Sequence, residues 1–158
     1  MQTIVVGVDG SEGANKALEF AAAEAALRGA RLRVVSAWHV PAEIFSGYFV
    51  PASDTFDAFD TFREGTEKIV SEAVATVQEL QPEIECEGTA VEGQPAEVLI
   101  QQAAGASLLV VGNRGLGGFS SLLLGSVSQQ VVHHTPCPVV IIPHGENSSA
   151  TSTARRPG

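Results

Sequence analysis

A run of glycine and hydroxyl residues between positions 112 and 128 has the residue types that hold phosphate groups. Gly112 and Gly115 follow an apolar, strand-like run. Nine residues separate Gly115 from Gly125, which with Ser126 marks the expected beginning of a helix. Phosphate oxygens need backbone N–H groups at close range, and a side chain at the turn would block their approach. The start of a helix adds N–H donors and partial positive charge. Spacing alone leaves two interpretations open, a phosphate site or an ordinary connection.

Polar side chains of the same segment could add to phosphate binding. Ser126 and Ser128 place hydroxyl groups in the first turn of the expected helix, and Arg114 is the one basic residue of the segment. Two stronger phosphate motifs are absent, because the chain has no Gly-Lys-Ser/Thr and no Gly-x-Gly-x-x-Gly after its first strand. Asp9 follows that first strand, where its carboxylate could accept from ligand hydroxyl groups or cap the next helix.

Apolar runs that indicate strands alternate along the chain with segments of helical spacing. The predicted strands cover residues 3–8, 32–38, 84–91, 108–111 and 139–142. The predicted helices run from 12 to 28, from 59 to 80, from 96 to 103, and from Gly125 or its neighbour to His134, and residues 39 to about 57 are predicted to be irregular. This alternation predicts a doubly wound α/β fold, a five-stranded parallel sheet with helices on both faces. Ligands of such sheets bind beyond the carboxyl ends of the strands, which would bring Asp9 and Gly112 together.

The composition predicts one globular domain over residues 1–144 and a disordered tail over 145–158. Hydrophobic residues make up 44% of the 158 residues, and the tail is rich in Ser, Thr, Gly and Arg. The net charge of −9 disfavours nucleic acid as a partner. No leader-like segment and no long apolar run is present, so the prediction is a cytoplasmic protein without membrane association.

Candidate metal ligands are few and poorly placed. Cys86 and Cys137 lie in apolar or strand-like surroundings and are predicted to be reduced thiols. His133 and His134 are neighbours on a predicted helix, where adjacent side chains point about 100° apart and rarely share an ion. No metal site is therefore predicted.

Three separated blocks of the chain agree in order and spacing with one known family. Its signature of Gly, two residues, Gly, nine residues, Gly, and then Ser or Thr is present here as Gly112, Gly115, Gly125 and Ser126. The runs from Val5 to Ser11 and from His134 to Val140 also match, although Ser107 stands where the family often has Asp. Over about residues 2–143, the chain thus resembles the universal stress proteins, in their ATP-binding subclass.

The resemblance implies a strand order of 3-2-1-4-5 and an adenine nucleotide bound at the strand ends. The main chain of Val8 and Ala37 would meet the adenine, and the carboxylate of Asp9 would accept from the ribose. The ribose and phosphate path would be lined by Val111, Gly112, Arg114 and Gly115. The phosphates would be held by Gly125, Ser126, Val127 and Ser128. Where Mg²⁺ is bound as well, it would bridge the phosphates.

The resemblance also implies a regulatory ATP-binding module of the stress response rather than an enzyme. Nothing near the phosphate segment resembles a catalytic base, so no catalytic residue is predicted. Two alternatives stay open, a slow ATPase aided by Arg114 and Mg²⁺, and a stress-associated scaffold with incidental AMP or cyclic AMP binding. Family members commonly dimerise through the last strand. The uncharged run Val139–Ile142 would be a pairing hazard at a sheet edge, which predicts a homodimer through this strand.

Overall fold

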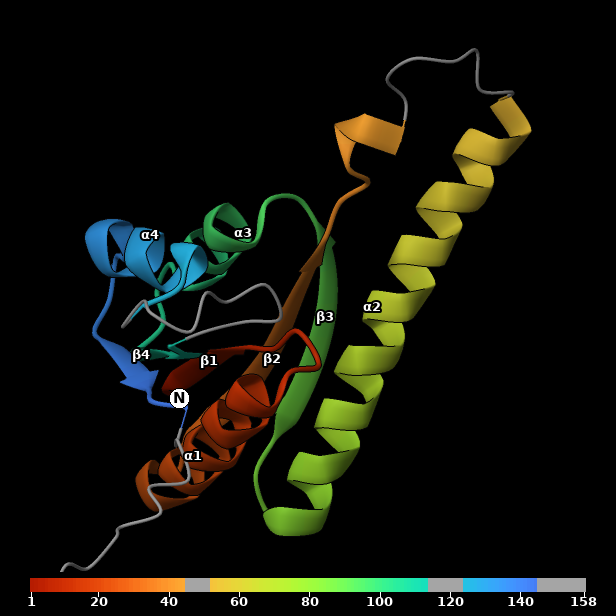
Figure 1. Cartoon of the computed structure of the whole chain (residues 1–158). Coiled ribbons are helices and arrows are strands. Elements are labelled where there is room, and N and C mark those ends of the chain that lie inside the picture. Colours follow the sequence, from red (N-terminus) through yellow and green to blue (C-terminus); the bar gives the residue numbers. More distant parts are fainter. Residues whose placement is uncertain (45–51, 114–123, 145–158) are drawn as a thin grey trace, which may run out of the picture.

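Five strands pair in parallel to form one sheet in the order β3-β2-β1-β4-β5 (Figure 1). The computed structural model describes residues 1–44, 52–113 and 124–144. The strands are β1 (Thr3–Gly7), β2 (Arg31–Trp38), β3 (Cys86–Glu92), β4 (Leu108–Gly112) and β5 (Val139–Ile142). The predicted fold class and strand order are confirmed. The predicted tail at 145–158 lies outside the described residues.

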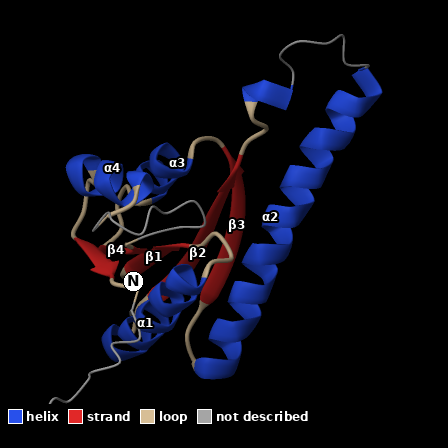
Figure 2. Ribbon diagram, viewed as in Figure 1, coloured by secondary structure: helices blue, strands red, loops and turns tan. Residues whose placement is uncertain are grey.

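Helices cover both faces of the sheet (Figure 2). One face carries α1 (Glu12–Arg28) and α2 (Ala52–Leu80), and the other carries α3 (Pro95–Gln102) and α4 (Ser126–His134). Each layer has its own apolar core, and alternate side chains of β1 enter the two cores, with Ile4 and Val6 on the α1 side and Val5 on the α3 side. Burial on both faces explains why β1 and β4 are uninterrupted apolar runs. Among the described helices, none is long and apolar enough to cross a membrane.

Local sequence signals set both ends of α1. The hydroxyl of Ser11 accepts a hydrogen bond from Ala14 N at 3.2 Å, so Ser11 is the N-cap. Gly29 ends the helix with a positive φ of 62°, and Arg28 pairs with Glu24 at 2.6 Å. The predicted cap, stop and bounds of this helix are confirmed.

The start of α2 differs from the sequence-based prediction. Residues up to about 57 were expected to be irregular, but a short 3₁₀ turn occupies Ala42–Ile44 and the long helix begins at Ala52. The first half of the helix extends beyond the sheet (Figure 1), and none of the side chains from 53 to 65 is buried. Phe56 is 70% exposed. Residues 53–58 bury no side chain, and the periodic apolar pattern on which the prediction depended begins only at Phe59.

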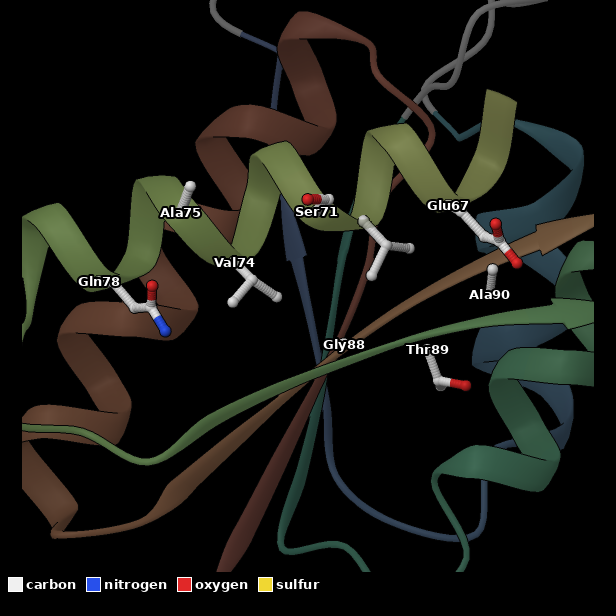
Figure 3. A pocket seen from close by; sticks show the side chains of 9 residues that line it. Glu67, Ser71, Val74, Ala75, Gln78, Gly88, Thr89 and Ala90 are labelled. Carbon is white, nitrogen blue, oxygen red and sulfur yellow. The ribbon is translucent and has the colours of Figure 1, made fainter. Parts of the chain in front are cut away.

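The edge strand β3 runs along α2 and leaves a groove of about 630 Å³ between them (Figure 3). A Cβ atom on Gly88 would collide with Val70 and lie 2.8 Å from Val74 Cγ2, so only glycine lets the helix pack this closely. The strand covers 86–92 rather than the predicted 84–91, and its predicted place at the sheet edge is confirmed.

Candidate phosphate site at the ends of β1 and β4

The carboxyl ends of β1 and β4 lie side by side next to the start of α1. The two strands pair in parallel, with Val6 opposite Val110. Beyond these pairs, a Cβ atom placed on Gly112 would be 3.1 Å from both the carbonyl carbon and the oxygen of Gly13. The structure thus brings the end of β4 against the first turn of α1, as the topology predicted. The turn that contains Asp9 connects β1 to this same helix.

Asp9 shapes the turn between β1 and α1. Its Oδ1 accepts a hydrogen bond from Ser11 N at 2.9 Å, and the next residue, Gly10, has a φ of 83° that favours glycine. The N-cap of α1 is Ser11 and not Asp9, so the capping alternative for Asp9 is wrong. The half-buried carboxylate instead holds the turn through one oxygen. A contact with ribose stays a prediction.

The residues expected near the adenine lie at the carboxyl ends of β1 and β2. Val8 is buried among the side chains of the α1 layer, and its N–H donates to Val35 O at 2.9 Å. Ala37 pairs with Val91 and is half-buried against the α3 layer. Val111 is also buried in that layer. These side chains pack into the protein, which leaves main-chain atoms as the predicted contacts with a base.

The start of α4 is held directly beside the end of β4. Gly125 is the N-cap of the helix, and its N–H donates to Asn113 O at 2.6 Å. Within the helix, Gln129 N donates to Gly125 O at 3.0 Å. The N–H groups of residues 126–128, which precede Gln129, have no acceptor within a helix that begins at Ser126. Ser126 is exposed there, and Val127 is half-buried. This is the donor arrangement that suits an anion.

Ser128 differs from its neighbour Ser126. Its side chain is only 3% exposed, and its hydroxyl donates to Gly112 O at 2.8 Å. The hydroxyl therefore joins α4 to β4, whereas its place in the glycine-rich segment predicted a bond to a phosphate oxygen. The backbone N–H of Ser128 remains the atom that the phosphate prediction can use.

Sequence reasoning missed Asn113, which follows β4 directly. Its backbone N donates to Ile142 O at 2.9 Å, and its side-chain Oδ1 accepts from His144 N at 2.8 Å. An Asn at the end of a strand is a common signal for a side chain that bonds nearby backbone, and this was the available clue. Arg114 and Gly115, the next two predicted residues, lie outside the described part of the chain.

Comparison with known protein families shows to which of them this chain belongs. Residues 1–143 match the model of the Universal stress protein family. The chain belongs to the universal stress protein family. A universal stress protein of Thermus aquaticus is 39% identical over 144 residues, which are 89% of this chain and 98% of that protein. Mycobacterial members at 36% identity are matched over 44% of their own length, so this chain spans less than half of them.

Solved structures of the family share this fold. One, a universal stress protein in complex with cAMP, is 29% identical, with a TM-score of 0.66 over 91% of this chain and 98% of that one. Another is the Archaeoglobus fulgidus protein in complex with dAMP, which is 26% identical, with a TM-score of 0.61 over 90% and 98% of the two chains.

The other candidate metal ligands of this universal stress protein are its two cysteines and the neighbouring residues His133 and His134. Cys86 and Cys137 are both free thiols and half-buried. Burial, together with the charge of Glu87, raises the pKa of the Cys86 thiol to about 11. The rings of His133 and His134 are 6.3 Å apart. Within the ranges that the structure describes, no three His, Cys, Asp or Glu residues gather into a metal-binding group.

Proposed function

We propose that this universal stress protein binds an adenine nucleotide, ATP foremost, and acts as a regulatory module of the stress response. The observation that carries the proposal is the start of α4, which the bond from Gly125 N to Asn113 O holds beside the end of β4. The N–H groups there, with the exposed Ser126, form a donor set that suits phosphate. Related proteins at 29% and 26% identity were crystallised with cAMP and dAMP, which supports adenine as the base.

The other parts of the nucleotide would be held by the strand ends. The main chain of Val8 and Ala37 would meet the adenine, and the Asp9 oxygen that does not face Ser11 N would accept from the ribose. Phosphates beyond the ribose would follow Val111, Gly112, Arg114 and Gly115 toward the first turn of α4. Mg²⁺, where it is bound, would be held chiefly by phosphate oxygens and would offset their charge.

We further propose that the protein performs no efficient chemistry. The carboxylate nearest to the proposed ribose, Asp9, already accepts from Ser11 N and is engaged in shaping the turn. A general base must reach the proton that it removes, and the ribose end is remote from the terminal phosphate. Slow ATP hydrolysis aided by Arg114, and a scaffold in which AMP or cAMP binding is incidental, are the competing functions.

A homodimer through β5 is part of the same proposal. The strand is at the edge of the sheet, and its four side chains, all apolar, are only half-buried within one chain. An uncharged apolar edge favours pairing with another strand. A two-fold axis beside β5 would join two copies by the same surface.

Native mass spectrometry of the purified full chain, followed by calorimetry with ATP, AMP and cAMP, tests the proposal. We expect a co-purified or added adenine nucleotide at one site per chain. Ser126→Ala should weaken ATP binding by about 1 kcal/mol, as for the loss of one hydrogen bond. A chain that binds none of the three nucleotides at millimolar concentration would rule out the proposed function.

A further inference from the structure

Asn113 makes at least three hydrogen bonds, and these join three parts of the fold. Its backbone N–H donates to Ile142 O at 2.9 Å, and its backbone carbonyl accepts from Gly125 N at 2.6 Å. Its side-chain Oδ1 accepts from His144 N at 2.8 Å. A single residue therefore holds the end of β4, the start of α4 and the end of β5 in one arrangement.

A second bond fixes the start of α4 against the same strand. The buried hydroxyl of Ser128 donates to Gly112 O at 2.8 Å, one residue before the carbonyl that receives Gly125 N. Two consecutive carbonyls of the chain thus accept from the first turn of the helix. The helix start cannot rotate or slide along β4 without breaking one of these bonds, so its N–H groups keep one direction.

We propose that Asn113 is a positioning residue of the nucleotide site and that it couples nucleotide binding to the end of β5. It acts through Gly125 on one side and His144 on the other. The proposal rests on the proposed function, since it takes the start of α4 as the phosphate subsite. Both contacts are made by one residue, so we expect a nucleotide that orders Asn113 through Gly125 to order the His144 contact as well. Because coupling is reciprocal, loss of the His144 contact should in turn weaken nucleotide binding.

The residue type supports this role. The amide oxygen of Asn accepts from a backbone N–H as well as a carboxylate does, but it carries no charge. A carboxylate at position 113 would keep the bond to His144 N and would repel phosphate close by. An alanine would remove the bond to His144 N and leave the backbone bond from Gly125 N without the support of that contact. Both variants lose the amide N–H donors, and they differ in whether an acceptor for His144 N is kept and in whether a charge is added.

The experiment compares the full-length chain with Asn113→Ala, Asn113→Asp and a matched control. The control is Ser107→Ala, because the Ser107 hydroxyl donates to Thr3 O at 3.1 Å at the opposite end of β4. It removes one side-chain bond to backbone from the same strand, away from the site. Amide hydrogen exchange at Gly125 and His144 is measured by NMR with and without ATP, and affinities for ATP and AMP are measured by calorimetry.

Each variant has its own expected pattern. Asn113→Ala should speed exchange at His144 and at Gly125 and raise the ATP dissociation constant, each by about tenfold. Asn113→Asp should leave exchange at His144 unchanged and weaken ATP more than AMP. Ser107→Ala should change none of these quantities. Saturating ATP should slow exchange at His144 in the wild-type chain and not in Asn113→Ala.

Two results would overturn the proposal. If Asn113→Ala binds ATP as tightly as Ser107→Ala does, Asn113 does not position the site. If ATP leaves His144 exchange in the wild-type chain unchanged, the coupling does not exist. Should Asn113→Ala fail to fold, equal losses of ATP and AMP affinity in Asn113→Asp would count against the role. A wild-type chain that binds no ATP contradicts the proposed function instead. In that case the positioning role is still tested without nucleotide, because unchanged exchange at Gly125 in Asn113→Ala would refute it.

Discussion

Gly112 packs against the backbone of Gly13, although 98 residues separate them in the sequence. A Cβ atom on Gly112 would lie 3.1 Å from the Gly13 carbonyl oxygen, which is closer than side chains normally approach backbone. The glycine that begins the family signature is therefore needed for the packing of α1 on β4. This requirement exists whether or not a phosphate is bound.

Gly112→Ala should consequently destabilise the protein as well as weaken nucleotide binding. The added methyl group must push the first turn of α1 away, and overpacking of this kind costs about 1–3 kcal/mol. Thermal unfolding and calorimetry with ATP on the same variant measure both effects. Gly65→Ala is the matched control, because nothing lies within 4 Å of the new Cβ and the helix interior gains from alanine. Unchanged stability of Gly112→Ala would contradict the packing argument.

Asp9→Asn and Asp9→Ala separate the two uses of this side chain. The amide of Asn can still accept from Ser11 N, so the turn should persist, whereas the carboxylate that would meet the ribose is lost. We expect both variants to lose about 1.5–3 kcal/mol of ATP binding, as for hydrogen bonds to charged groups. Only Asp9→Ala should also lower the unfolding temperature.

The cap residue beside it provides the control for Asp9. Ser11→Ala removes the hydroxyl that accepts from Ala14 N and should cost about 1 kcal/mol of stability. Its intrinsic affinity for ATP should stay at the wild-type value. If the Asp9 variants behave like Ser11→Ala, with stability lost and binding kept, the ribose contact is refuted.

ATP turnover should be slower than about one per minute, far below ordinary enzyme rates. The physical reason is that Asp9 is engaged with Ser11 N and is assigned to the ribose end of the ligand. Single-turnover release of labelled phosphate measures the rate without interference from contaminating ATPases when Arg114→Ala is run in parallel. Several turnovers per second, abolished by Arg114→Ala, would instead establish the ATPase.

Ile141→Pro should convert the expected dimer into a monomer. In the parallel ladder, Leu109 N bonds Pro138 O and Asn113 N bonds Ile142 O, so the even-numbered residues of β5 face β4. The N–H of Ile141 then points to the open edge, and proline removes it without breaking the ladder with β4. Sedimentation equilibrium at micromolar concentration gives the molar mass of the wild-type chain and of Ile141→Pro in solution.

The opposite edge of the sheet offers the control for this test. In β3 the odd-numbered residues face β2, since Leu32 N bonds Glu85 O and Gly93 N bonds Trp38 O. Ala90→Pro therefore also removes an outward N–H, and it should leave the dimer intact. A wild-type chain that is monomeric, or equal behaviour of both proline variants, would refute pairing through β5.

The Cys86 thiol should react with iodoacetamide more slowly in the folded chain than in the unfolded chain at pH 8. Burial and Glu87 raise its pKa from 9.0 to about 11, so the reactive thiolate is scarcer in the folded state. Because the folded pKa is the higher one, the contribution of this group to stability is complete below pH 9 and falls as the pH rises toward 11. Mass spectrometry of the labelled peptide gives the rate, and equal rates in both states would contradict the shift.

Elements with strong local signals were predictable from the sequence. The bounds of β5 and the N-cap and end of α1 agree with prediction, because apolar periodicity, a capping Ser and a terminal Gly act within a few residues. The start of α2 was not predictable in this way, since its first turns bury no stripe. A helical segment that buries no apolar side chains leaves only a weak periodic pattern in the sequence.

The sequence predicted which strand ends and which helix start lie together, but not the contacts between them. Glycines at a strand end and before a helix indicated a phosphate segment, and parallel topology placed it near Asp9. The bonds from Asn113 to His144 and from Ser128 to Gly112 join residues 31 and 16 positions apart. Such contacts depend on how β5 and α4 pack, which no short spacing in the sequence encodes.

The long helix α2 buries side chains at one end only. Thr66, Val70, Ala73 and Val77 are buried, whereas none of the side chains from 53 to 65 is. The packed half supplies the nucleus that an isolated helix of this length would lack, and Phe59 adds a ring contact with Trp38 at 6.2 Å. We expect the turns before Phe59 to grow or fray one at a time. The length of α2 in solution therefore varies with temperature, and cooling lengthens it toward Ala52. Far-ultraviolet circular dichroism should accordingly show a gradual loss of helix well below the cooperative unfolding transition.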